Sequence, residues 1–199
     1  MTAAKINFDS HIAQCAEAIT IHEFLEKHGY AADFGLRYVW VASVSALDHY
    51  VSELIVEKST EHFSNGSPLN GRLLNEMIPI SALLRIQTVS GPQAVVEFRS
   101  IVSQAIRFRT FQKANDIADG LAFVWKEQYK WEKISNLIGL NAKKTKSKLN
   151  GICYRRDLIA HNADFNEATG ALTPCIREDA QEVSDYISTI VEAIDKLVP

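Results

Sequence analysis

One short stretch, about four-fifths of the way along the chain, carries the residue types of a proton-transfer site. It reads Arg155-Arg156-Asp157-Leu158-Ile159-Ala160-His161-Asn162. A histidine can transfer protons near neutral pH, a carboxylate can orient its imidazole ring, and a guanidinium fits phosphate oxygens. Together these groups are suited to the cleavage of a phosphodiester bond without a metal ion.

The spacing of Asp157 and His161 places both on one face if the stretch is helical. Each residue turns a helix by about 100°, so side chains four positions apart are neighbours. We therefore expect the Asp157 carboxylate to hydrogen-bond the His161 imidazole and to fix its tautomer. Arg156 points roughly 140° away from His161. Its side chain must bend back, or a second copy of the protein must supply the complementary group.

An ordinary surface helix is the alternative reading of this spacing. With nine Arg and six His in 199 residues, an Arg followed five positions later by a His is expected by chance about 0.3 times. A surface pair of Arg156 and Asp157, on a helix whose last turn ends in His161, would be favoured by the helix dipole without any catalytic role.

A run of basic residues leads into the same stretch. It consists of Lys143, Lys144, Lys146, Lys148, Arg155 and Arg156, with no acidic residue between them. Lys144, Lys148 and Arg155 fall near one helical face, and together with Asn162, which follows His161, they are the candidate contacts for a polyanion. Such a strip attracts a polyanion in a salt-dependent way. A solvated charged face is the alternative.

Composition favours one well-packed domain over residues 1–199. Hydrophobic residues make up 47% of the chain and charged residues 23%, which is typical of globular proteins. The net charge of −3 excludes a general polycation, so any nucleic acid must be bound by a local basic patch. Cys15, Cys153 and Cys175 lack a metal-type spacing, and we expect reduced thiols, with Cys153 and Cys175 as small core residues.

Targeting and cofactor signals are not found in the sequence. The first residues show no long apolar segment of the secretory type, and the most apolar window is too short for a membrane span. There is no glycine-rich phosphate loop and no dinucleotide fingerprint. We expect a cytoplasmic protein with no membrane association, no cofactor and no metal site.

Apolar residues recur at helical spacing along the chain and predict an all-α fold. We expect helices over residues 8–28, 35–58, 92–113, 142–162 and 178–197, with shorter or broken segments over 69–88, 115–125 and 128–137. No whole segment alternates with a period of two. Four aromatic residues, Phe98, Phe108, Phe111 and Phe123, are expected in the core rather than on a base-stacking surface. The architecture is predicted to be an antiparallel helical bundle with additional short helices.

The residues from Arg156 to His161 resemble the signature of the HEPN superfamily, which is an Arg, a polar residue, a few apolar residues and a His. That signature sits on the penultimate long helix of an all-α bundle, as it would here. The order that follows, Ile159–Asp164, Thr169-Gly170 and Arg177–Ala180, resembles the RiboL-PSP type. The likeness covers about the last 60 residues, and the first part of the chain agrees only in length and helical character.

The resemblance implies a metal-independent endoribonuclease that acts as a homodimer with the two motifs facing each other. It implies that His161 is the general base or acid, that Arg156 binds the scissile phosphate, and that Asp157 orients one of them. RNA is then the substrate, and a toxin–antitoxin or antiviral defence role implies an antitoxin or defence-system partner. The alternatives are a non-catalytic HEPN-like module that binds RNA or protein, and a helical interaction module in which the motif is incidental.

Overall fold

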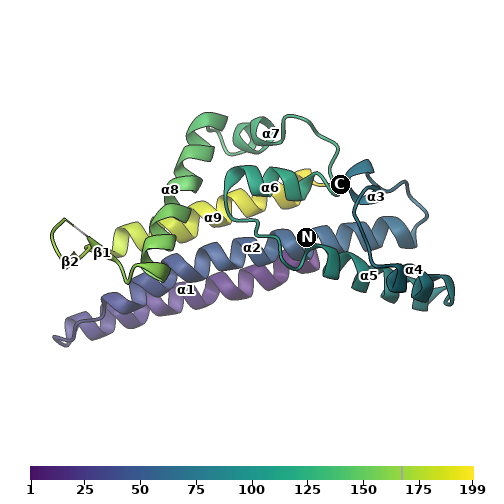
Figure 1. Cartoon of the computed structure of the whole chain (residues 1–199). Coiled ribbons are helices and arrows are strands. Elements are labelled where there is room, and N and C mark those ends of the chain that lie inside the picture. Colours follow the sequence, from purple (N-terminus) through teal and green to yellow (C-terminus); the bar gives the residue numbers. More distant parts are fainter. Residues whose placement is uncertain (167) are drawn as a thin grey trace.

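The computed structural model describes residues 1–166 and 168–199, most of which are helical (Figure 1). The long helices are α1 (Ala3–Lys27), α2 (Asp33–Ser64), α5 (Pro92–Ile106), α8 (Ala142–His161) and α9 (Arg177–Leu197). Short helices are α3 (Gly71–Leu74), α4 (Ile80–Gln87), α6 (Ala114–Leu121) and α7 (Lys130–Leu137). Two strands, β1 (Phe165–Asn166) and β2 (Ala171–Leu172), pair in an antiparallel hairpin. The all-α prediction is confirmed, although the small hairpin was not predicted.

Helix α2 forms the centre of the bundle. It packs against α1, α5, α6, α8 and α9, and it buries apolar side chains on more than one side. Fully buried residues of α2 include Leu47, Val51, Leu54 and Ile55. Burying each such side chain stabilises the fold by about 1.5–3 kcal/mol. By length and composition α2 could cross a membrane, but 56% of its apolar window is buried inside the protein, as is usual for a core helix.

Helices α1 and α2 form an antiparallel hairpin, and α9 lies alongside both (Figure 1). The connection turns at Gly29, whose φ of 81° suits glycine. Helix α1 begins five residues earlier than predicted because the Thr2 hydroxyl accepts a hydrogen bond from the Lys5 amide at 3.1 Å. In the same view α8 crosses this layer steeply, with the β hairpin beyond its lower end.

Helix α5 ends at Ile106, whereas the sequence predicted a helix to residue 113. The cause is a tertiary contact, because the Asp48 carboxylate of α2 accepts a hydrogen bond from the Phe111 amide at 2.7 Å. Phe111 is buried there, but Phe108 is left 84% exposed. The prediction of a core position is therefore right for Phe111 and wrong for Phe108.

Helix α8 is continuous from its predicted first residue. The Asn141 side chain accepts hydrogen bonds from the amides of Lys143 and Lys144 at 2.9 and 3.3 Å, as an N-cap residue does. Gly151 does not interrupt the helix, since it lies on the exposed face opposite the buried Leu149 and Ile152. The helix therefore runs unbroken to His161, its last residue.

Candidate functional site

Arg156, Asp157 and His161 all lie in the last two turns of α8. Five residues correspond to a rise of about 7.5 Å along the helix, so Arg156 and His161 are about 1.4 turns apart. The Arg156 side chain is only 13% exposed, while Asp157 is half-buried and His161 is exposed. The site thus combines a sheltered guanidinium with an imidazole that solvent or substrate can reach.

Arg156 is held by a short hydrogen-bonded chain that begins on α2. Its Nη2 donates to Gln112 Oε1, and Gln112 Nε2 donates to Asp48 Oδ2 at 2.6 Å. Asp157 Oδ1 lies 3.2 Å from Arg156 Nη1. Because neighbouring hydrogen bonds in a poorly solvated site polarise and strengthen one another, this chain fixes the orientation of the guanidinium. The buried Nε–H of Arg156 has no acceptor among the described residues.

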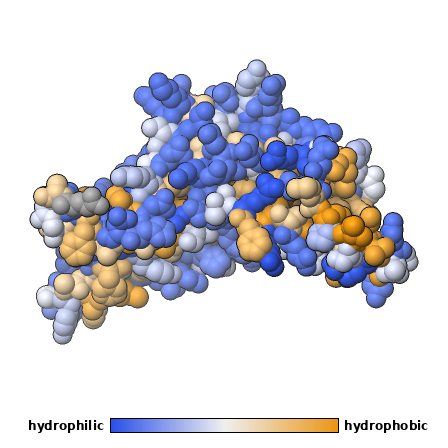
Figure 2. All heavy atoms as spheres, in the orientation of Figure 1, coloured by the Kyte–Doolittle hydropathy of each residue, from blue (hydrophilic) through white to orange (hydrophobic). Residues whose placement is uncertain are grey.

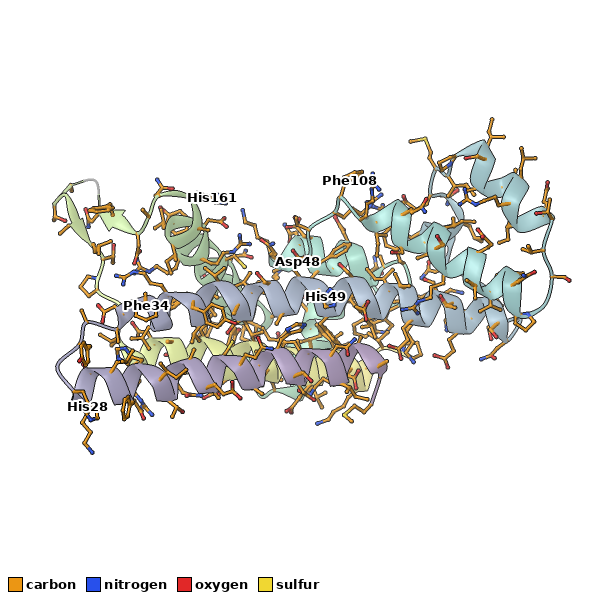
Figure 3. The ribbon with its side chains drawn as sticks, turned by 90° about the horizontal axis from the view of Figure 1, so that it is seen from below. His28, Phe34, Asp48, His49, Phe108 and His161 are labelled. Carbon is orange, nitrogen blue, oxygen red and sulfur yellow. The ribbon has the colours of Figure 1, made fainter. Side chains whose placement is uncertain are left out.

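The predicted hydrogen bond between Asp157 and His161 is wrong for the described residues, in which the Asp157 carboxylate pairs with Arg156 instead. A charge-assisted contact between a guanidinium and a carboxylate is strong, and the Arg156 guanidinium lies within reach of Asp157. His161, at the open end of the helix, extends toward solvent. Figure 3 shows it at one edge of the molecule, with Asp48 and His49 farther along α2.

Arg155 faces a different part of the molecule from Arg156. Its guanidinium binds Asp164, which follows the C-terminal end of α8. Its Nη1 lies 2.6 Å from Oδ1 of Asp164, and Arg37 of α2 places its Nε 2.7 Å from the other oxygen. Asp164 is 1% exposed and follows Ala163 in a left-handed turn, with φ values of 50° and 62°. Two guanidiniums therefore neutralise one buried carboxylate. The predicted RNA contact of Arg155 stays a prediction, and its observed contacts are structural.

One residue of the basic run on α8, Lys148, pairs with an acidic residue of α9. Lys148 Nζ lies 2.5 Å from Glu182 Oε1 and 4.3 Å from the centre of the Tyr186 ring. The hydrogen bond from Lys148 lowers the pKa of the Glu182 carboxyl. Lys144 and Asn162 are exposed. Glu182 therefore offsets the positive charge of the predicted strip at Lys148, and the RNA contacts of Lys144, Lys148 and Asn162 stay predictions.

Cys153 packs behind the motif. Its thiol donates to the Gln112 carbonyl at 3.2 Å, and burial raises the pKa of the thiol to about 11 despite the nearby Arg156. Cys153 and Cys175 are buried and free, in agreement with their prediction as small core residues. Within the described part of the chain, no three His, Cys, Asp or Glu side chains come together to hold a metal ion.

The comparison with protein families decides what kind of domain this is. A family model described as RiboL-PSP-HEPN matches residues 13–198. The chain belongs to the RiboL-PSP-HEPN family. The match includes α2 and α5, so the RiboL-PSP-HEPN likeness extends well beyond the last third of the sequence, where the motif alone indicated it. Neither a curated protein nor a solved structure was found to match the chain.

Sequence reasoning missed the residues that support the RiboL-PSP-HEPN motif, namely Asp48, Gln112, Arg37 and Asp164. A signal was present for Asp48, which shares a helical face with the buried Val44, Val51 and Ile55. A carboxylate within an apolar face needs hydrogen-bond donors, and the structure supplies them from Phe111 and Gln112. Gln112 itself, in a polar connecting segment, carried no such signal.

Proposed function

We propose that this protein is a metal-independent endoribonuclease that acts as a homodimer. The observation that supports it most directly is the placement of Arg156, whose side chain is 13% exposed and whose guanidinium is held by Gln112 and Asp157. The same helix ends in the exposed His161. A guanidinium oriented in advance and partly removed from water stabilises developing negative charge more strongly than a mobile surface arginine.

In the proposed reaction His161 removes the proton from a ribose 2′-OH, and the 2′ oxygen attacks the adjacent phosphorus. The bond from phosphorus to the 5′ oxygen breaks, and that oxygen takes a proton from a second imidazole. The products are a 2′,3′-cyclic phosphate and a 5′-hydroxyl. Arg156 balances the added negative charge on the phosphate oxygens, and Asp157 orients Arg156.

A homodimer accounts for the second imidazole and for the divergence of Arg156 and His161 on one helix. Two copies of α8 that face each other would line one cleft from both sides. Lys144 and Asn162 are exposed and can contact RNA directly. Lys148 and Arg155 would first have to exchange their carboxylate partners for phosphate. Light scattering is expected to give twice the chain mass of 22.2 kDa.

The test is the cleavage of an end-labelled single-stranded RNA in EDTA. His161→Ala and Arg156→Ala should each lower kcat by about 10²- to 10⁴-fold. The matched control for the histidine is His28→Ala, because His28 is also exposed at the end of a helix. The control for the arginine is Arg85→Ala, which removes an exposed pair with Glu97.

Cleavage that survives both motif substitutions, or that requires a divalent cation, would contradict the proposal. Salt-sensitive RNA binding without any cleavage, left intact by His161→Ala, would instead assign the protein to the alternative class of non-catalytic RNA-binding modules. Light scattering at the mass of one chain would contradict the dimer.

We further propose a toxin or defence role in the cytoplasm, in which an antitoxin or defence-system partner controls the nuclease. The family membership supports an RNase-like or RNA-binding activity, and the free thiols of the described chain suit a reducing compartment. Induced expression is expected to arrest bacterial growth, and His161→Ala should relieve the arrest at equal protein level. Equal arrest by both proteins would contradict the toxin role.

A further inference from the structure

A polar hollow of about 350 Å³ lies among α6, α7 and the first half of α8. Its lining residues come from these three helices and from the segment that joins α6 to α7. Figure 2 shows mainly hydrophilic side chains, in blue, along the top of the molecule, where Figure 1 places these helices. The volume falls within the range of about 300–1,000 Å³ that is typical of ligand pockets.

A line of contacts along one side of α8 joins this hollow to the motif. Arg156 donates to the Gln112 side chain, and farther toward the start of α8 Asn150 accepts from the Ala114 amide at 3.0 Å. Lys146, four residues before Asn150, lines the hollow. Arg156 and Lys146 are separated by about 15 Å along the helix axis. An RNA strand that passes the motif along α8 therefore reaches the hollow within a few nucleotides.

Hydrogen bonds hold the walls of the hollow in place. The Trp131 ring nitrogen donates to the Ala114 carbonyl at 2.7 Å, which ties α7 to the start of α6. The Tyr129 amide donates to Glu127 Oε1 at 2.9 Å, and Lys130 Nζ donates to the Glu127 carbonyl at 2.6 Å. These bonds restrain the segment before α7, with Tyr129 left 61% exposed. A site that is ordered in advance loses less conformational entropy when it binds a ligand.

The lining combines an aromatic ring with amide and charged side chains. The ring of Tyr129 is a surface on which a planar group can stack. Asn115 and Gln128 each offer a hydrogen-bond donor and an acceptor. The ionisable side chains are two carboxylates and two amines, from Asp119, Glu132, Lys130 and Lys146. Because these charges balance, the hollow suits a neutral polar group better than a phosphate.

A nucleobase is the neutral, planar and polar group of an RNA strand. Its face stacks on aromatic side chains, and its edge forms hydrogen bonds with amides and carboxylates. The carboxylates of Asp119 and Glu132 accept hydrogen bonds but do not donate them. They therefore favour a base with an exocyclic amino group, as in cytosine, over uracil, which carries a carbonyl oxygen at the same position.

We propose that this hollow binds one base of the RNA substrate, a base with an exocyclic amino group, a few nucleotides from the bond that is cleaved. Tyr129 stacks on the base, and Asp119 and Glu132 accept hydrogen bonds from its amino group. The assignment rests on the proposed function, since it takes RNA as the ligand of the α8 motif. It adds a base preference to that function.

The probes are two fluorescein-labelled RNAs of about five nucleotides, one of cytidines and one of uridines, with every 2′-OH methylated. Methylation removes the nucleophile of the proposed reaction, so binding is measured separately from cleavage. Fluorescence anisotropy with the full-length protein should show that the cytidine probe binds at least about fivefold more tightly than the uridine probe.

Substitutions of Tyr129 test the stacking. Tyr129→Ala should weaken binding of the cytidine probe by about fivefold or more, whereas Tyr129→Phe keeps the ring and should retain binding. The matched control is Tyr30→Ala, because Tyr30 is 65% exposed and lies between α1 and α2, outside the hollow. Its binding should stay unchanged. Circular dichroism will verify that each variant is folded.

A double substitution of the two carboxylates tests the base preference. Asp119→Asn combined with Glu132→Gln should bring the two probes to equal affinity, since an amide accepts from the cytosine amino group and donates to the uracil carbonyl alike. The ratio of the two affinities is the readout, because the removal of two negative charges strengthens the binding of any RNA.

Several results would overturn the proposal. These are the absence of binding by both probes, equal binding of both probes by the wild type, and equal effects of Tyr129→Ala and Tyr30→Ala. Cytidine monophosphate that binds as tightly as the cytidine probe would assign the hollow to a free nucleotide instead of a strand. Failure of the nuclease looks different: a wild type that prefers the cytidine probe but cleaves no unmethylated RNA would contradict the endoribonuclease and support the base site.

Discussion

Arg155 and Asp164 form an ion pair across the end of α8, with Nη1 2.6 Å from Oδ1. Arg37 binds the same carboxylate from the first turns of α2. It also donates to the Thr173 carbonyl at 2.9 Å, so one guanidinium joins both sides of the β hairpin. The last turn of α8, which carries His161, is thereby fastened to the central helix of the bundle.

Asp164→Asn should destabilise the fold by about 3–5 kcal/mol, because it leaves two guanidiniums facing each other without a carboxylate. Chemical denaturation measures the free energy of unfolding. Glu23→Gln is the control, since it removes an exposed pair with Arg177 that contributes about 0–1 kcal/mol. Equal free energies of unfolding for the two variants would show that the ion pairs of Asp164 with Arg37 and Arg155 do not stabilise the fold.

If the proposed nuclease activity is present, Gln112→Ala should lower kcat for RNA cleavage by about tenfold or more with little change in KM, because Arg156 loses its anchor. The expected loss of stability is about 1–2 kcal/mol. A merely structural role predicts normal kcat in the folded fraction. Gln112→Glu alone should also impair the proposed activity, since it brings a second carboxylate against Asp48.

The double variant Gln112→Glu with Asp48→Asn provides a rescue. The Asn at position 48 can donate to the Glu at position 112, which still accepts from Arg156, so only the link between positions 48 and 112 changes direction and the connection is kept. We expect kcat to recover toward the wild-type value. Failure to recover, with the protein folded, would mean that the link from Asp48 to Arg156 has no positioning role.

Cys153 should make stability depend on pH in the alkaline range. Burial raises the pKa of its thiol from 9.0 to about 11. A folded-state pKa above the unfolded value gives stability that is fully present below about pH 9 and is lost as the pH rises toward 11. The Tm of the wild type should therefore fall more between about pH 8 and pH 10.5 than the Tm of Cys153→Ala. Ser147→Ala, exposed on the same helix, should keep the wild-type slope.

Two glycines should respond oppositely to alanine. At Gly120 an added Cβ would lie 2.6 Å from two ring carbons of Phe111, so Gly120→Ala should cost about 1–3 kcal/mol. At Gly151 an added Cβ would meet no heavy atom within 4 Å beyond its chain neighbours and the backbone of its own helix, and alanine should stabilise α8 by about 0.5–1 kcal/mol. Thermal and chemical unfolding of both variants test this pair. The same sign of change in both would contradict the packing around Phe111.

The features that could be predicted from the sequence are those set by residues close together along the chain. Helix α8 begins at Ala142 because Asn141 caps it, and α9 follows from an uninterrupted apolar seam. The Arg156–His161 motif was found because its residues are close along the chain, and the family match supports its HEPN assignment.

The remaining features depend on contacts between residues far apart in the sequence. Asp48 ends α5 and anchors Gln112, which is 64 positions away. Lys148 meets Glu182 only because α8 and α9 pack together. The turn through Ala163 and Asp164 has positive φ values at residues other than glycine, so the local sequence does not predict it. The preference of Asp157 for Arg156 likewise follows from side-chain geometry rather than from spacing.

The base of the β hairpin is closed independently of its tip. The Thr173 amide donates to the Asp164 carbonyl at 2.8 Å, directly beneath the β1–β2 pair. When the two ends of a loop are already joined, each doubling of the loop length costs only about 0.6 kcal/mol of conformational free energy. The tip can therefore be enlarged or replaced without disturbing the motif beside it, which makes it a natural place for sequence variation or for grafting a new loop.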